Sequence, residues 1–201
     1  MSWDNCALLT NSLKPYACCR HTHAADYCAQ LLRGEHRLEP EHITRIVDHT
    51  YQVAVNTVDN PEPSTPYGYK FSGQYCTAAM LVYGHLGESS FTPEATSDPR
   101  VRRLMDKITL VCDPELEASY QADRNRWAHR LEVTLEDGRV LTRQVEYPYG
   151  DFNNPFTWAY EHEKFHTLAD GVLGPDRVAA LVERLPHLEE LDDINRLFEG
   201  L

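Results

Sequence analysis

The strongest chemical signal in this sequence is a short cationic segment at residues 14–23, which reads KPYACCRHTH. It holds Lys14, Arg20, His21 and His23 and contains no acidic residue. Lysine binds a carboxylate as a point charge, whereas the planar guanidinium of arginine binds one through two hydrogen bonds. Histidine titrates near neutral pH and can move a proton to or from carbon or a hydroxyl group. The segment therefore indicates a site for a small polycarboxylate.

Two other interpretations of this segment stay open. The first is a basic surface loop with incidental histidines, since clustered charges mark functional sites only some of the time. The second is a zinc site formed by Cys18, Cys19, His21 and His23, although adjacent cysteines do not match the usual Cys-x2–4-Cys spacing. If His23 begins a helix, the backbone N–H groups of that helix terminus add further donors for an anion.

Composition excludes several classes of protein. The formal net charge is −12, and no dense Lys/Arg cluster offers the basic face that a nucleic acid needs. The apolar runs are far shorter than the roughly 20 residues of a membrane helix, and the first residues lack a basic and then apolar leader, so we expect no membrane and no secretion. Six cysteines are few for 201 residues, and they favour a reduced, cytoplasmic compartment.

Local patterns predict a mixture of helices and strands. An Asp-Gly pair at 137–138 between two alternating runs is a strong hairpin signal. Gly34 is a natural end for the first helix, and Asp98 or Ser97 a cap for a later one. We expect helices at 23–33, 71–86, after Pro99 and from Thr157 onward, and strands within 43–55, at 108–112, at 131–135 and at 140–145. Together they predict one α+β domain, an antiparallel sheet with packed helices.

Two further groups of residues invite a functional interpretation. His162, Glu163 and His166 match the His-Glu-x-x-His pattern of zinc peptidases, but no third ligand follows at the usual spacing, and Phe165 and Leu168 are expected to form a buried stripe. We therefore expect no bound metal. A second group either approaches a substrate or belongs to the core and helix caps, and it comprises Lys70, Ser72, Gln74 and Tyr75.

Four segments resemble the MmgE/PrpD family. Residues 14–26 resemble the signature that opens the carboxy-terminal domain of that family. Three further segments follow in the family's order, at 69–84, at 97–108, and at 148–157 with 163–169. Together these segments cover nearly the whole chain from Leu13 onward.

The resemblance implies the smaller, α+β carboxy-terminal domain of a two-domain lyase. The domain would span residues 13–201, with residues 1–12 as a remnant of the interdomain segment and an all-helical amino-terminal domain absent. The family's enzymes act on small di- and tricarboxylates without a metal or organic cofactor, in a cleft between the two domains. Lys14 matches a site lysine of the family and is expected to anchor a carboxylate. The amino-terminal domain, on the other side of the cleft, would supply further acid/base and substrate-binding groups.

These residues and the resemblance together predict a cofactor-independent hydro-lyase similar to 2-methylcitrate dehydratase, and hence a place in propionate metabolism. We predict Lys14 and His23 as catalytic residues, the latter in proton transfer, and Arg20 and His21 as substrate-binding residues. The family's cis-aconitate decarboxylases carry a catalytic histidine where this chain has Cys19, which argues against that activity.

The alternative, from a different class, is a catalytically silent fragment that serves as a binding or assembly module. We expect a homodimer or association with a helical amino-terminal domain, because a domain cut from its partner exposes an apolar surface. The expected contact surface comprises Trp3, Leu8, Leu9 and Tyr16.

Overall fold

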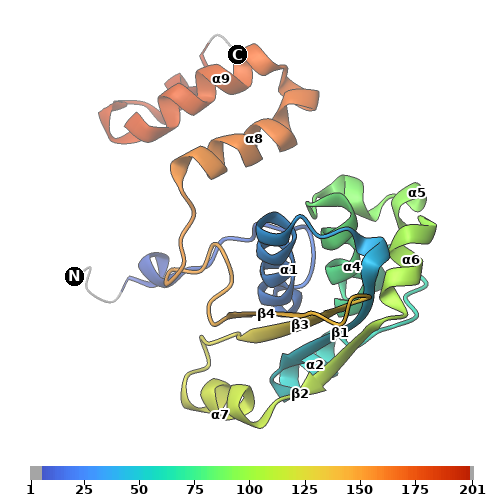
Figure 1. The fold of residues 1–201 in the computed structure, drawn as a ribbon. Coiled ribbons are helices and arrows are strands. Elements are labelled where there is room, and N and C mark those ends of the chain that lie inside the picture. The colour runs from blue at the N-terminus through green and yellow to red at the C-terminus, as the bar shows by residue number, and fades with distance from the viewer. Residues whose placement is uncertain (1–5, 200–201) are drawn as a thin grey trace. The chain divides into compact units, whose positions relative to one another are not determined.

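The structure, a computed structural model, describes residues 6–199 (Figure 1). It divides into two compact units, with the boundary between Asn154 and Pro155. The first unit carries the cationic segment and a four-stranded sheet, and the second is helical. The domain expected over residues 13–201 thus comprises two units.

The sheet has the strand order β2-β1-β3-β4. The strands are β1 (Ile43–Thr50), β2 (Ile108–Cys112), β3 (His129–Leu135) and β4 (Val140–Val145). β3 pairs antiparallel with β1 and β4, and the predicted hairpin is confirmed, with Gly138 at φ +85° in its turn. β1 and β2 pair in parallel, because several helices cross over between them, so the α+β sheet is mixed where the sequence predicts antiparallel pairing throughout.

Seven helices of the described first unit surround this sheet. They are α1 (His23–His36), α2 (Gln52–Val58), α3 (Pro66–Lys70), α4 (Gly73–Tyr83), α5 (Pro93–Thr96), α6 (Pro99–Met105) and α7 (Pro114–Ala122). Figure 1 shows α1 and α4 on one side of the sheet and α2 and α7 on the other. The side that carries α1 and α4 holds the main core, to which both helices contribute buried residues.

Helix boundaries follow local capping chemistry. Asp98 caps α6 as predicted, accepting from the Arg100 N–H at 2.8 Å. α4 is shorter than the predicted 71–86, because Ser72 caps its start and Gly84, at φ +79°, ends it. The predicted stop at Gly34 is wrong: α1 continues for two residues, and Arg37 adopts the left-handed conformation that ends it.

The predicted strand within residues 43–55 is also shorter than expected. β1 ends at Thr50, and the β-branched residues that follow belong to α2. Ala54 and Val58 are fully buried four residues apart, which is the spacing of one helix face. Packing of that face outweighs the strand propensity of the segment.

The second unit contains α8 (Trp158–Leu173) and α9 (Pro175–Arg184), followed by 3-10 turns at Leu185–Glu190 and Ile194–Phe198. The helical character predicted from Thr157 onward is confirmed, and the Thr157 hydroxyl caps α8. No described helix has both the length and the apolar character needed to cross a membrane.

Replacing Ile46 with alanine is expected to lower the free energy of unfolding by about 2–5 kcal/mol, because this fully buried side chain lies in β1, an inner strand, and its loss leaves a cavity. Thr109→Ala, on an exposed position of the neighbouring β2, is the control and should cost less than about 1 kcal/mol. Urea unfolding measures both. Equal losses would contradict the assigned core.

Candidate active site

The cationic segment and Leu13, the residue before it, are held in place by backbone hydrogen bonds to three distant parts of the first unit. The Leu13 N–H donates to the Gly150 carbonyl at 2.8 Å, the Ala17 N–H to Leu86 at 3.0 Å, and the Cys19 N–H to Lys70 at 2.8 Å. A 3-10 turn at Arg20–Thr22 then leads directly into α1. The segment is therefore an ordered part of the fold, which disfavours a loose surface loop.

Lys14 is exposed, and its ammonium donates to the Cys18 carbonyl at 3.0 Å. An ammonium has three donors, so two remain for other partners. No carboxylate among residues 6–199 forms an ion pair with it. This lysine is therefore a cation that can take a carboxylate of a ligand without first breaking a salt bridge.

Arg20, by contrast, is bound within the protein. Its guanidinium lies 3.3 Å from the Asp151 carboxylate, and the two side chains are only 13% and 7% exposed. It also donates to the Leu13 carbonyl at 3.2 Å. Arg20 thus fastens the loop after β4 to the start of the cationic segment. The substrate-binding role predicted for Arg20 stays a prediction, and it would require part of this network to open.

His21 is half-buried in an aromatic setting. Its Nδ1 lies 2.7 Å from the Tyr51 hydroxyl, and its ring stacks on Trp127 with centroids 4.5 Å apart and planes 5° apart. Burial lowers the pKa of His21 to about 4, with a smaller contribution from nearby His129. His21 is therefore neutral at physiological pH, so it can bind a ligand through a hydrogen bond but not as a cation.

His23 is fully buried at the start of α1. Its Nε2 lies 3.3 Å from the Cys18 carbonyl, and its ring meets Tyr16 edge-on at 5.2 Å between centroids. Its Nδ1 has no hydrogen-bond partner among residues 6–199. Direct proton transfer to a substrate stays a prediction for His23, but a ring without exposed surface cannot reach a ligand in this conformation.

Two buried residues of the segment, Cys18 and Thr22, form a polar cluster with Asp26 of α1 and Cys76 of α4. The Thr22 hydroxyl donates to the Asp26 carboxyl at 2.7 Å, and the Cys18 thiol lies 3.6 Å from the same oxygen. Burial raises the pKa of Asp26 well above its ordinary value. The carboxyl is enclosed in the core, where burial disfavours its charged form, and this suits a structural role.

Metal-ligand geometry within the described residues is limited to that same cluster. Its two thiols and one carboxylate oxygen lie within 4.8 Å of one another, and no fourth His, Cys, Asp or Glu of residues 6–199 joins them. The four side chains of the zinc interpretation do not converge, so that interpretation is wrong. His166, from the His-Glu-x-x-His pattern, instead lies 3.0 Å from Asp170 on α8.

Cys19 lies between Lys14 and His21 along the chain. Its side chain is buried. Burial raises the pKa of this thiol, and the nearby Lys14 charge opposes the shift without reversing it. Cys19 is therefore protonated at neutral pH and is not a ready nucleophile.

In the second group of candidates from the sequence, Gln74 and Tyr75 are buried in the core and Ser72 caps α4, whereas Lys70 forms a part-exposed ion pair. Gln74 donates to Asp59 at 2.6 Å, the Tyr75 hydroxyl donates to the Ser90 carbonyl at 2.5 Å, and Lys70 pairs with Glu88 at 3.0 Å. The predicted buried stripe on the last long helix is wrong, since no residue of α8 is buried and Leu168 is 57% exposed.

The expected contact surface is only partly present. Leu8 and Leu9 are 78% and 69% exposed, as predicted. Tyr16 is buried and its hydroxyl donates to Gln30 at 2.7 Å, so its inclusion was wrong. Trp3 lies outside the described residues.

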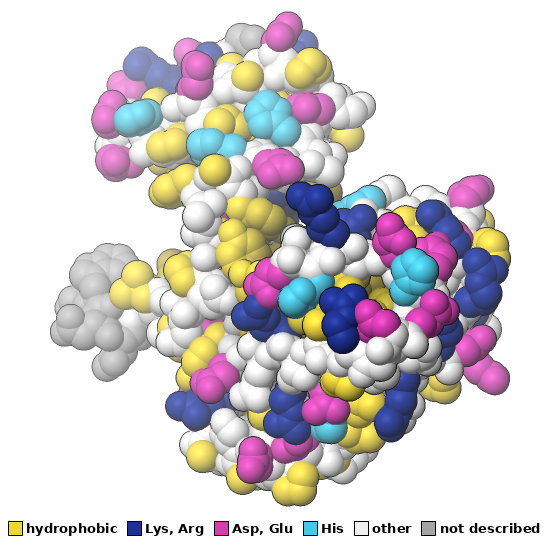
Figure 2. Space-filling view, viewed as in Figure 1, with side chains coloured by type: hydrophobic (Ala, Val, Ile, Leu, Met, Phe, Trp, Pro, Cys, Tyr) yellow, Lys and Arg dark blue, Asp and Glu magenta, His cyan; other side chains and the backbone are white. Residues whose placement is uncertain are grey.

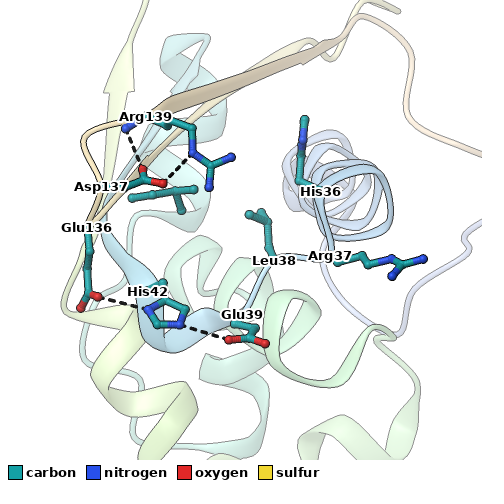
Figure 3. Close-up of a pocket in the computed structure, with 9 residues that line it drawn as sticks. His36, Arg37, Leu38, Glu39, His42, Glu136, Asp137 and Arg139 are labelled. Atoms are coloured by element: carbon teal, nitrogen blue, oxygen red, sulfur yellow. Dashed lines mark hydrogen bonds and ion pairs between the residues drawn. The ribbon is translucent and has the colours of Figure 1, made fainter.

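A separate pocket of about 340 Å³ opens at the other end of α1 (Figure 3). Figure 3 shows His42 between Glu39 and Glu136, at 3.1 Å from each, and Arg139 paired with Asp137 at 2.7 Å. The cations that line it are thus largely matched by acids. It is a poorer site for a polycarboxylate than the surface around Lys14.

Comparison with known proteins places the chain in a family. Residues 16–187 match the MmgE/PrpD C-terminal domain, so the chain belongs to the MmgE/PrpD family. It is 27% identical to cis-aconitate decarboxylase of Mus musculus over 83% of this chain and 35% of that protein. It is 32% identical to mitochondrial 2-methylcitrate dehydratase of Yarrowia lipolytica, over 65% of this chain and 26% of that protein.

A third relative is 2-methylcitrate dehydratase of Cupriavidus necator, 35% identical over 54% of this chain and 23% of that protein. The chain therefore spans about a third or less of the length of these three relatives. The resemblance to the MmgE/PrpD family is confirmed, and so is the α+β carboxy-terminal domain.

Sequence reasoning missed Tyr51 and Trp127, the two residues that hold His21. Tyr51 lies next to β1 and Trp127 precedes β3, so both are far from His21 along the chain. Nothing in their local patterns marks them. The pairing of β1 with β3 brings the ends of these two strands together, and both residues contact His21 there.

Arg20→Met is expected to lower the free energy of unfolding by about 1–3 kcal/mol, because it leaves the poorly exposed Asp151 carboxylate without its cation. The double variant with Asp151→Asn should lose less than the two single losses combined, since each variant breaks the same contact. Urea unfolding of the four proteins measures the coupling. Strictly additive losses would show that the pair contributes nothing.

His21 predicts a pH dependence of stability. The unfolded chain binds a proton on His21 near pH 6.5, and the folded chain only near pH 4. Between these values the unfolded state holds more protons, so stability falls as the pH falls from about 6.5 to about 4. His21→Gln cannot titrate and should show a shallower fall in its urea midpoint over this range. Parallel pH profiles for the two proteins would refute the low pKa.

Proposed function

We propose that this chain forms one wall of the active site of a lyase for small di- and tricarboxylates, most similar in action to 2-methylcitrate dehydratase. The observation that carries the proposal is Lys14, an exposed ammonium without a carboxylate partner among residues 6–199, on a segment tied to three parts of the fold. Relatives that match 54–83% of this chain are named 2-methylcitrate dehydratase and cis-aconitate decarboxylase, which supports the same substrate class.

The surface around Lys14 suits one part of a dehydration. Removing a proton from carbon next to a carboxylate builds negative charge on that carboxylate, and a fixed cation stabilises the charge as it develops. Lys14 is positioned by the Cys18 carbonyl and supplies this cation. In our proposal it anchors the substrate carboxylate and lowers the barrier to proton loss.

The cationic segment does not itself supply the groups that would transfer protons. His21 has a low pKa and His23 is fully buried, so neither is a ready general base. We therefore place the base, and the acid that assists the loss of hydroxide, in the regions of the longer relatives that lie outside the matched part. His23 then acts as a positioning residue beneath the segment. The proposal requires no metal or organic cofactor.

A second candidate function is a binding or assembly module without activity of its own. The exposed Leu8 and Leu9, together with Leu13 at 51% exposure, favour it, because they form apolar surface directly before Lys14. Under either function we propose a cytoplasmic protein that forms a homodimer or binds a helical amino-terminal domain. The same apolar residues would lie in that contact.

Turnover assays separate the two functions. The chain would be incubated with 2-methylcitrate, citrate and cis-aconitate, alone and with the helical domain of a two-domain relative, and sedimentation would report association. Turnover that depends on the helical domain supports the lyase. Association without turnover of any of the three substrates favours the assembly module.

Lys14→Ala, in a version of the enzyme that includes the helical domain, is expected to lower kcat/KM at least tenfold. A charge-assisted contact to a carboxylate is worth roughly 1.5–3 kcal/mol, and alanine removes it. Lys107→Ala is the matched control, because the Lys107 ammonium also donates to a backbone carbonyl, that of Ile43 at 2.5 Å, and should leave kcat/KM unchanged. Unchanged kinetics in Lys14→Ala would remove Lys14 as the anchor.

A further inference from the structure

We propose that Tyr51 and Trp127 hold His21 as the neutral Nε2–H tautomer, and that His21 binds a substrate oxygen by donating this N–H. The inference rests on the proposed function, because it takes the surface around Lys14 as the carboxylate site. It assigns His21 a role as hydrogen-bond donor, distinct from a cationic anchor and from a general base. Tyr51 and Trp127 act as positioning residues.

The direction of one hydrogen bond fixes the tautomer. Tyr51 has no exposed surface, and its hydroxyl has one partner among the described residues, His21 Nδ1 at 2.7 Å. If Nδ1 carried the proton and donated it, the buried Tyr51 O–H would have no acceptor, which is costly. The Tyr51 hydroxyl therefore donates to an unprotonated Nδ1. A neutral imidazole then carries its proton on Nε2.

The surroundings keep the ring neutral and fixed. Burial is the first cause of the low pKa of His21, and His129 the second. His129 lies in β3 and pairs with Asp48 of β1 at 2.7 Å, so both groups belong to strands packed under the segment. Trp127 stacks on His21 and is itself held by its indole N–H, which donates to the Arg124 carbonyl at 2.8 Å. The ring thus has little freedom to rotate.

Nε2 points to where a ligand can reach it. No residue of the described part accepts a hydrogen bond from it, and it is absent from the buried polar atoms that lack a partner. The Lys14 charge acts on the thiol of Cys19, which lies two residues before His21 along the chain. Lys14 and His21 thus flank Cys19 on one ordered segment, and in our proposal they bind different oxygens of one hydroxy-polycarboxylate, Lys14 a carboxylate and His21 the hydroxyl or a second carboxylate.

Nitrogen-15 NMR of the imidazoles in the full chain tests the tautomer, with His21→Gln assigning the signal. The expected result is a proton on Nε2 and none on Nδ1, unchanged from pH 7.5 to 5.5. Tyr51→Phe should abolish the tautomer preference, whereas Tyr120→Phe should keep it, because Tyr120 stacks on Tyr51 and the hydroxyl on His21 Nδ1 is that of Tyr51. A proton on Nδ1, or double protonation by pH 6, would overturn the proposal.

A citrate titration followed in the same spectra tests the donor role. Citrate should shift the His21 Nε2 signal, and His21→Leu should bind it roughly three- to tenfold more weakly, the value of one hydrogen bond. His21→Gln, whose amide offers an N–H at a similar place, should bind within about twofold of the unaltered chain. Citrate that shifts signals around Lys14 but not Nε2 overturns this inference and leaves the proposed function standing. Citrate that shifts neither overturns both.

Discussion

The structure around the candidate site depends on the buried hydrogen bond between Thr22 and Asp26 at the start of α1. This contact, 2.7 Å long and wholly shielded from water, fixes the turn through which the cationic segment enters the helix. A buried carboxyl is tolerated there because it accepts hydrogen bonds from the Thr22 hydroxyl and the Cys18 thiol. With the turn fixed, His23 must point into the core, while Lys14 and His21 remain toward the surface.

That constraint explains why a cluster of four basic side chains separates into different roles. Arg20 holds the loop after β4, His23 fills the core, and His21 is held in an aromatic stack. Of these four, Lys14 is the cation that keeps donors free for a ligand within the described structure, and His21 offers one neutral donor. Figure 2 shows acidic and basic side chains interspersed over the visible face of the molecule. The net charge of the chain therefore does not determine the local charge around Lys14.

Much of the fold could be predicted from local chemistry, and the site only in part. The Asp-Gly turn and the Asp98 cap act within a few residues, so sequence patterns reveal them. The burial of His23 and the stacking of Trp127 arise from contacts between segments distant in sequence, which local patterns do not encode. The cationic segment itself was visible because basic residues are scarce in so acidic a chain. The exposure of each basic side chain in this segment depends on how the segment enters α1, which its sequence alone does not reveal.

The most direct test of this account is a crystal structure of the chain with citrate, the probe closest to the substrates named for its relatives. The account predicts a citrate carboxylate within hydrogen-bonding distance of the Lys14 ammonium and a citrate oxygen on His21 Nε2. It would be contradicted by citrate bound only in the pocket at the far end of α1, between His42 and Arg139, or by an empty surface around Lys14 at saturating citrate.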